Sequence, residues 1–123
     1  MVRQNEGVII NMSSQMGHVG SELNRTVYVM TKHALEGLTK AMAVELAPKG
    51  VRVVSVAPTF VQTPLTKPFF EDPVFKKWVL DRIPLGRLGT ADEVAKAVVF
   101  LASPAAALIT GATLLIDGGF TAR

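Results

Sequence analysis

The fold is decided by a helix that runs directly into a buried strand, in the stretch VYVMTKHALEGLTKAMAVELAPKGVRVVSVAP, residues 27–58. Apolar and small residues recur at helical spacing on two stripes through residues 27–46, which predicts a helix that is buried on two sides. Pro48 and Gly50 end the helical pattern. The run VRVVSVA that follows, residues 51–57, is apolar and rich in branched side chains, as a buried strand is.

A second apolar run lies upstream of this helix, in GVIINM at residues 7–12. Strand, helix and strand in this order form a βαβ unit, whose strands are parallel and whose crossover is right-handed. Downstream, residues 58–84 are irregular and rich in proline, and one more strand is expected at residues 113–116. The sequence therefore predicts an α/β fold with three strands of a doubly wound parallel sheet.

Two further helices are expected in the second half of the chain. The Asp-Pro pair at residues 72–73 begins a short helix that ends near Arg82. Thr90 and Glu93 have the spacing of a capping box, which opens a longer helix that Pro104 ends. Three parallel strands are few for a sheet whose faces and edges must both be covered, so the chain is interpreted as part of a larger sheet.

The composition fits a single folded domain and excludes several kinds of site. The 123 residues, 49% hydrophobic and 19% charged, can bury a core and are unlike a disordered chain. The absence of cysteine excludes disulfides and thiolate metal sites. Only His18 and His33 are histidines, so a histidine-rich metal site is excluded, and no metal is expected.

The charge pattern argues against nucleic acid and membrane as partners. The net charge of +3 comes from scattered lysines and arginines and not from a basic cluster. No apolar run reaches the roughly 18–20 residues that span a membrane. The polar start, MVRQNEG, lacks the apolar core of a signal peptide, which makes the cytoplasm the expected compartment.

Three side chains form a candidate catalytic group. Tyr28 and Lys32 are four residues apart on the long helix, so they share one face, and Ser14 follows the end of the first strand. An ammonium group beside a phenol stabilises the phenolate, which suits a tyrosine to proton transfer. The serine hydroxyl could hold a substrate oxygen. By spacing alone, a partly buried tyrosine beside a surface lysine is the more common explanation of such a pair.

Three motifs in this order resemble a known family. They are NMSSQMG at residues 11–17, the stretch from Tyr28 to Pro64 that begins YVMTK, and the stretch from Pro84 to Gly119 that ends IDGG. Together they resemble the C-terminal half of the short-chain dehydrogenase/reductase family, and are similar to its sugar and gluconate dehydrogenases and 3-oxoacyl reductases. The resemblance implies that residues 1–123 are a partial Rossmann-like domain of an oxidoreductase that uses NAD or NADP.

The resemblance assigns roles to the catalytic group. It implies that Tyr28 is the acid/base, that Lys32 assists it and holds the nicotinamide ribose, and that Ser14 orients the substrate. Ser13 is the competing serine. The substrate class it implies is a small alcohol or carbonyl compound, and the reaction is hydride transfer between this compound and the nicotinamide.

Further positions match the cofactor side of the family's site. Pro58, Val61 and Thr63 match residues that contact the nicotinamide end of the cofactor. Thr59 departs from the pattern, because the family usually has glycine after the proline. The stretch from Gln62 to Pro84 matches the variable substrate lid, whose apolar cover would come from Leu65, Phe69, Phe70 and Trp78. Ordinary packing explains these side chains equally well.

The resemblance also shows what residues 1–123 do not contain. The family's glycine-rich turn for the pyrophosphate is absent from the sequence, as is the residue that selects NAD or NADP. We therefore expect no useful turnover from these residues alone. The alternative to an enzyme is an inactive fragment, or a segment that works with a separate N-terminal half. A homo-oligomer is expected through the long helix, since the family commonly pairs there.

Overall fold

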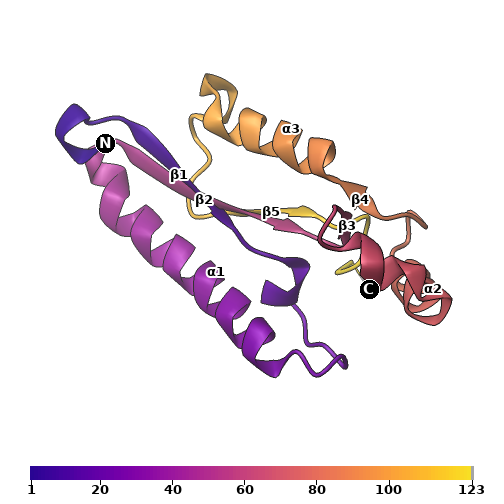
Figure 1. The fold of residues 1–123 in the computed structure, drawn as a ribbon. Coiled ribbons are helices and arrows are strands. Elements are labelled where there is room, and N and C mark those ends of the chain that lie inside the picture. The colour runs from indigo at the N-terminus through magenta and orange to yellow at the C-terminus, as the bar shows by residue number, and fades with distance from the viewer. Residues whose placement is uncertain (123) are drawn as a thin grey trace.

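The computed structural model describes residues 1–122 and has an α/β fold (Figure 1). The strands are β1 (Gly7–Met12), β2 (Val51–Pro58), β3 (Val61–Gln62), β4 (Gly89–Thr90) and β5 (Thr113–Ile116). The α-helices are α1 (Thr26–Leu46), α2 (Pro73–Arg82) and α3 (Ala91–Ala102). Single 3-10 turns lie at η1 (Val2–Gln4), η2 (Gln15–Gly17), η3 (Ala47–Lys49), η4 (Lys67–Glu71) and η5 (Pro104–Ala106).

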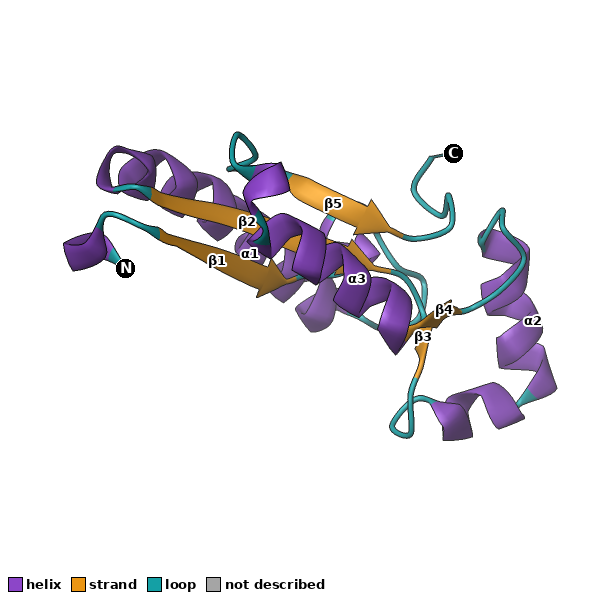
Figure 2. Cartoon of the chain, turned by 90° about the horizontal axis from the view of Figure 1, so that it is seen from above, coloured by secondary structure: helices purple, strands orange, loops and turns teal. Residues whose placement is uncertain are grey.

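The main sheet has three parallel strands in the order β1-β2-β5. In Figure 1, α1 lies below the sheet and α3 above it, and Figure 2 shows the sheet between these two helices. This arrangement confirms the predicted fold class. Because all three strands run the same way, their carboxyl ends meet at one edge, where parallel sheets place their ligands.

The central strand β2 supplies most of the core. Its valines are buried almost completely, and Val54 and Val56 pack with Leu101 of α3 on one face. The opposite face meets α1, and there the strand carries a polar side chain, Ser55, which is fully buried. An almost continuous apolar run is what a strand covered on both faces requires, and Arg52 and Ser55 are the exceptions to it.

The predicted two-sided burial of α1 is wrong for this structure. One face packs on the sheet and buries Glu36, Thr39 and Ala43. The other apolar stripe is exposed to solvent, with Met30 61% and Val44 77% exposed. Helical spacing identifies an apolar stripe but does not tell which neighbouring element covers it, and here only the sheet does.

The proline-rich region contains more regular structure than was predicted. The strands β3 and β4 pair in parallel over two residues each, so the predicted count of three strands is incomplete. These two short strands and α2 form a separate unit at the carboxyl end of the main sheet (Figures 1 and 2). The predicted start of α2 is confirmed, since the Asp72 carboxylate accepts a hydrogen bond from the Val74 backbone at 2.9 Å.

The capping box at the start of α3 is confirmed. The Thr90 hydroxyl accepts from the Glu93 backbone at 3.2 Å, and the Glu93 carboxylate accepts from the Thr90 backbone at 2.9 Å. Arg87 donates to the other carboxylate oxygen at 2.6 Å. Hydrogen bonds from Arg87 and Thr90 lower the pKa of Glu93 to about 2.

Removing this cap should weaken the fold measurably. Thr90→Ala is expected to lower the free energy of unfolding by about 1 kcal/mol, because the first-turn N–H groups lose an acceptor. Urea unfolding followed by circular dichroism measures the loss. Thr90→Ser keeps the hydroxyl and should recover most of it, and an equal loss in both variants would contradict the capping role.

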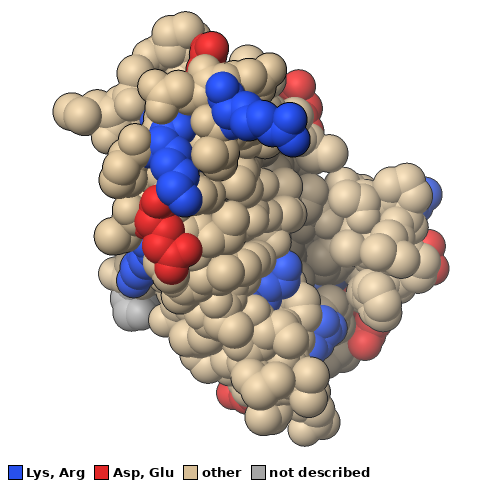
Figure 3. All heavy atoms as spheres, turned by 90° about the vertical axis from the view of Figure 1, so that its left-hand side faces the viewer, with Lys and Arg blue, Asp and Glu red and all other residues tan. Residues whose placement is uncertain are grey.

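None of the helices in residues 1–122 combines the length and apolar character that crossing a bilayer requires. On the face shown in Figure 3, basic and acidic side chains lie in small separate groups on a mostly uncharged surface.

Candidate active site

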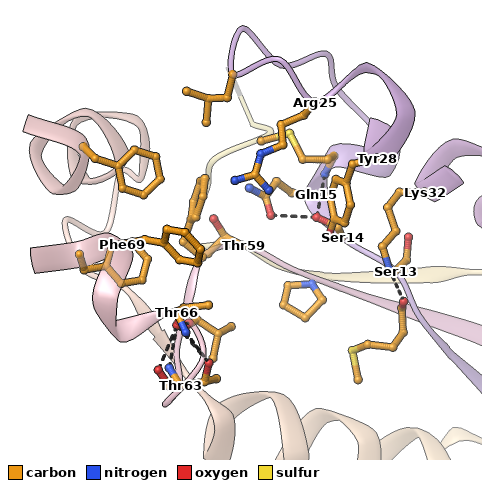
Figure 4. A pocket seen from close by; sticks show the side chains of 18 residues that line it. Ser13, Ser14, Gln15, Arg25, Tyr28, Lys32, Thr59, Thr63, Thr66 and Phe69 are labelled. Carbon is orange, nitrogen blue, oxygen red and sulfur yellow. Dashed lines mark hydrogen bonds between the residues drawn. The ribbon is translucent and has the colours of Figure 1, made fainter. Parts of the chain in front are cut away.

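A cavity of about 350 Å³ lies where β1 and β2 end. Its wall contains all six side chains that the sequence singled out for the site: Ser14, Tyr28, Lys32, Pro58, Val61 and Thr63. Figure 4 shows them around one hollow, with residues of η2 and α1 on one side and the segment after β2 on the other. Residues up to 49 positions apart in the chain thus meet because parallel strands end at the same edge.

Ser14 is held by the turn that it begins. Its hydroxyl accepts from the Met16 backbone N–H at 3.2 Å and lies 3.5 Å from the side-chain oxygen of Gln15. The residue is 6% exposed, and Figure 4 draws it directly beside Tyr28. Ser13 is also buried and also lines the cavity, so the structure brings both serines near the site.

Tyr28 and Lys32 lie one helical turn apart, as predicted. The Lys32 ammonium donates to the Met12 carbonyl, the last of β1, at 2.8 Å and lies 5.5 Å from the centre of the Tyr28 ring. Lys32 is half-buried and fixed to the sheet, unlike a solvated surface lysine. Tyr28 is 39% exposed, so its ring is open to a ligand entering the cavity.

The opposite wall is shaped by a hydrogen-bonded pair of threonines: Thr63, which the sequence singled out, and Thr66, which it did not. The Thr66 hydroxyl donates to the Val61 carbonyl at 2.6 Å and accepts from the Thr63 backbone N–H at 2.9 Å. These bonds fold the segment after β3 into a compact turn. The signal was present in the spacing T-x-x-T, which favours side-chain to backbone bonds in turns.

A buried carboxylate under the site was also missed. Glu36 lies one turn beyond Lys32, is 6% exposed, and accepts from Ser55 of β2 at 3.0 Å and from Thr113 of β5. His18, at the end of η2, places its Nε2 3.4 Å from the same carboxylate. Glu36 therefore joins α1, two strands and the turn that follows Ser14.

Hydrogen bonding decides the charge of this carboxylate. Burial alone would raise the pKa of Glu36, but the hydroxyls of Ser13, Thr113 and Ser55 and the nearby His18 outweigh burial, and the pKa is lowered. An acid within an otherwise apolar helix face was the sequence signal for this role.

The lid residues divide into two groups. Phe69 and Phe70 line the cavity together with Phe75, whereas Leu65 is 81% exposed and lies outside the wall. Trp78 also lies outside it and packs edge-on against Phe60. The expected apolar cover therefore consists of phenylalanines only.

Hydrogen bonds and an ion pair connect α2, the helix of the expected lid, to the loop before α1. This helix is called the lid helix below. The Glu22 carboxylate accepts from the Trp78 indole at 2.9 Å and from the Arg82 guanidinium, which stacks on the Trp78 ring 3.8 Å from its centre. These contacts fix α2 across the cavity from α1.

Within residues 1–122, no three histidine or acidic side chains gather in a way that could hold a metal ion. The cavity itself presents hydroxyl, phenol and ammonium groups.

Comparison with known proteins identifies the family. Residues 1–121 match the family model described as enoyl-(acyl carrier protein) reductase. The chain is 47% identical to L-xylulose reductase of Bos taurus over 116 residues, which cover 94% of this chain and 47% of that protein.

Solved structures agree in fold. A putative 2-deoxy-D-gluconate 3-dehydrogenase of Agrobacterium tumefaciens with bound NADP superimposes with a TM-score of 0.93 at 37% identity, covering 99% of this chain and 50% of that one. For 4-hydroxyisoleucine dehydrogenase complexed with NADH, the TM-score is 0.93 at 34% identity, with 98% of this chain and 50% of that one covered. The chain thus spans about half the length of the relatives it matches, and it belongs to the short-chain dehydrogenase/reductase family of NAD(P)-dependent oxidoreductases.

Proposed function

We propose that this chain is the catalytic half of an NAD(P)-dependent oxidoreductase that interconverts an alcohol and a carbonyl compound. The observation that carries the proposal is the meeting of Ser14, Tyr28 and Lys32 in one cavity at the carboxyl end of a parallel sheet. Hydroxyl, phenol and ammonium groups in this arrangement can orient a substrate oxygen and move a proton to or from it.

Each side chain has a distinct part in the proposed reaction. Ser14, fixed by η2, hydrogen-bonds the substrate oxygen, and Tyr28 gives this oxygen a proton or takes one from it. Lys32 stabilises the negative charge that the Tyr28 oxygen carries when its proton has left. The bound nicotinamide supplies or accepts the hydride.

The residues on the sheet edge fit the nicotinamide end of the cofactor. Lys32 is anchored beside Tyr28 with its remaining N–H groups free for ribose hydroxyls, and Thr63 presents a hydroxyl to the same cavity. Pro58 and Val61 border the space between them. Relatives with NADP and with NADH are both known, so either nicotinamide cofactor fits the proposal.

Three further proposals concern the missing segment, the oligomeric state and the compartment. Because the chain spans half of its relatives, we propose that turnover requires a segment that supplies the pyrophosphate site. An inactive fragment is the alternative. The exposed stripe of α1, which includes Met30 and Val44, is the proposed contact in a homo-oligomer, and the cytoplasm stays the proposed compartment.

Cofactor binding tests the proposal directly. NADH and NADPH are titrated into the 123-residue chain, and nicotinamide fluorescence reports binding. Lys32→Met is expected to weaken binding about tenfold, because a charged donor to the ribose is lost. Lys40→Met is the matched control, since Lys40 is an exposed lysine two turns further along the same helix.

The outcomes separate the enzyme from the alternative. Saturable binding that Lys32→Met weakens and Lys40→Met leaves unchanged supports the proposed function. If neither cofactor binds to the folded chain, or if both lysine variants behave alike, the inactive fragment becomes the better explanation.

A further inference from the structure

The charged side chains that line the cavity are both basic. Among the 18 residues of its wall in the described chain, Arg25 and Lys32 are the only charged ones. The Lys32 ammonium is engaged by the Met12 carbonyl. Arg25 makes no side-chain hydrogen bond or ion pair within residues 1–122, so the cavity contains an unused guanidinium group.

The nearest acidic side chains cannot neutralise this guanidinium because they serve elsewhere. Glu22, in the same loop, is bound by Arg82 and Trp78 of the lid helix. Glu36 lies under η2 and is bound by Ser55 and Thr113. Arg25 is an exposed residue at the edge of the cavity, so its guanidinium is open to a ligand that enters from solvent.

Gln15 provides a second, independent observation at the same place. It is 2% exposed, and its side-chain oxygen lies 3.5 Å from the Ser14 hydroxyl. Its amide nitrogen has no hydrogen-bond partner within residues 1–122, although the residue lines the cavity. Figure 4 shows Gln15 and Arg25 reaching into the hollow next to each other, so two donors without acceptors face one space.

Their position relative to Tyr28 separates them from the proposed cofactor side. Arg25 comes three residues before Tyr28 and is the residue that precedes the first turn of α1, whereas Lys32 comes four residues after it. The two cations therefore lie on opposite sides of the phenol along the helix. A ligand group beside Arg25 belongs to the substrate if the cofactor occupies the side of Lys32.

We propose that Arg25 and Gln15 bind a carboxylate of the substrate, so that the protein acts on hydroxy or oxo acids. The inference rests on the proposed function, since it extends the same cavity. A planar guanidinium binds a carboxylate with two parallel hydrogen bonds, and the Gln15 amide adds a third donor. One available cation matches the single charge of a carboxylate, and the apolar wall formed by Phe69, Phe70 and Phe75 suits a short carbon chain.

A matched pair of ligands tests the charge requirement. 5-Oxohexanoate and its methyl ester have the same ketone and carbon chain and differ in the carboxylate. Each is titrated into the 15N-labelled 123-residue chain without cofactor, and shifts of the Arg25 side-chain and Gln15 amide resonances report binding. The acid is expected to bind about fivefold to tenfold more tightly than the ester, as one charge-assisted contact allows.

Variants assign the preference to Arg25. Arg25→Gln should remove the preference for the acid, and Arg25→Lys should restore part of it. Arg3→Gln is the control, because it lowers the net charge equally at an exposed position outside the cavity. Equal binding of acid and ester, or equal losses in Arg25→Gln and Arg3→Gln, would overturn the proposal. Competition by inorganic phosphate as strong as by the acid would overturn the assignment to a carboxylate.

This test and the cofactor titration fail independently. An acid preference that depends on Arg25 stands even if Lys32→Met has no effect on nicotinamide binding. Conversely, cofactor binding that depends on Lys32, without any preference for the acid, would support the proposed oxidoreductase function and contradict the proposed carboxylate subsite.

Discussion

Tyr28→Phe is expected to lower turnover by about 100-fold to 10,000-fold, the range that loss of a positioned acid or base produces. The phenylalanine ring keeps the shape of the cavity wall but cannot give or take a proton. Ser14 and Lys32 still hold the substrate oxygen and the cofactor, so KM should change much less than kcat.

The measurement needs the cofactor half that the relatives contain. A chimera joins the N-terminal half of the bovine L-xylulose reductase to residues 1–123, and the loss of NADPH absorbance with a small ketone follows turnover. The 47% identity between the two proteins makes the join between matching elements feasible.

Two variants make the result specific. His33→Gln changes a side chain on the same helix that is exposed and lies outside the cavity wall, and it should leave turnover unchanged. Ser14→Ala should lower kcat as well, because the oxygen loses a donor. Undiminished turnover in Tyr28→Phe would remove Tyr28 from the proposed chemistry.

The sequence predicted the elements that local patterns control. The branched run of β2, the proline and glycine after α1 and the capping box of α3 each follow from residues close together in the chain, and the structure confirms all three. Parallel strands must end at one edge, so the gathering of Ser14 and Tyr28 also followed from the order of the elements.

What the sequence did not predict depends on contacts between distant elements. The exposure of Met30 depends on which stripe of α1 meets the sheet. The role proposed for Arg25 depends on the fact that no acidic side chain of residues 1–122 lines the cavity. The role of Glu36 depends on the hydrogen bonds that it accepts from Ser55 and Thr113. These contacts result from the packing of several segments against one another. The spacing of residues within one segment therefore cannot predict them.

The buried carboxylate of Glu36 should be a major source of stability. Glu36→Ala is expected to lower the free energy of unfolding by about 3 kcal/mol, because the hydroxyls of Ser55 and Thr113 lose their buried acceptor. Glu36→Gln keeps the volume and one acceptor oxygen and should cost about 1–2 kcal/mol. Urea unfolding at neutral pH measures both losses.

Glu45→Gln is the matched control for this experiment. Glu45 lies on the same helix but is exposed, so the same change of charge and shape should alter stability by less than about 0.5 kcal/mol. Equal effects of the two glutamine variants would show that Glu36 contributes no more than a surface charge.

The contribution of Glu36 should also depend on pH in one direction. Because the pKa of Glu36 is lower in the folded chain than the ordinary value of 4.5, folding favours the ionised form. The stabilisation is complete above that value and is lost as the pH falls through the folded pKa. The difference in unfolding free energy between the wild type and Glu36→Gln should therefore shrink as the pH falls below about 5. Subtracting the variant removes the acid sensitivity that Glu93 and Asp117, whose pKa values are also lowered, contribute to both proteins. A difference that grew below pH 5 would mean that folding favours the protonated form of Glu36, contrary to the hydrogen bonds that its carboxylate accepts.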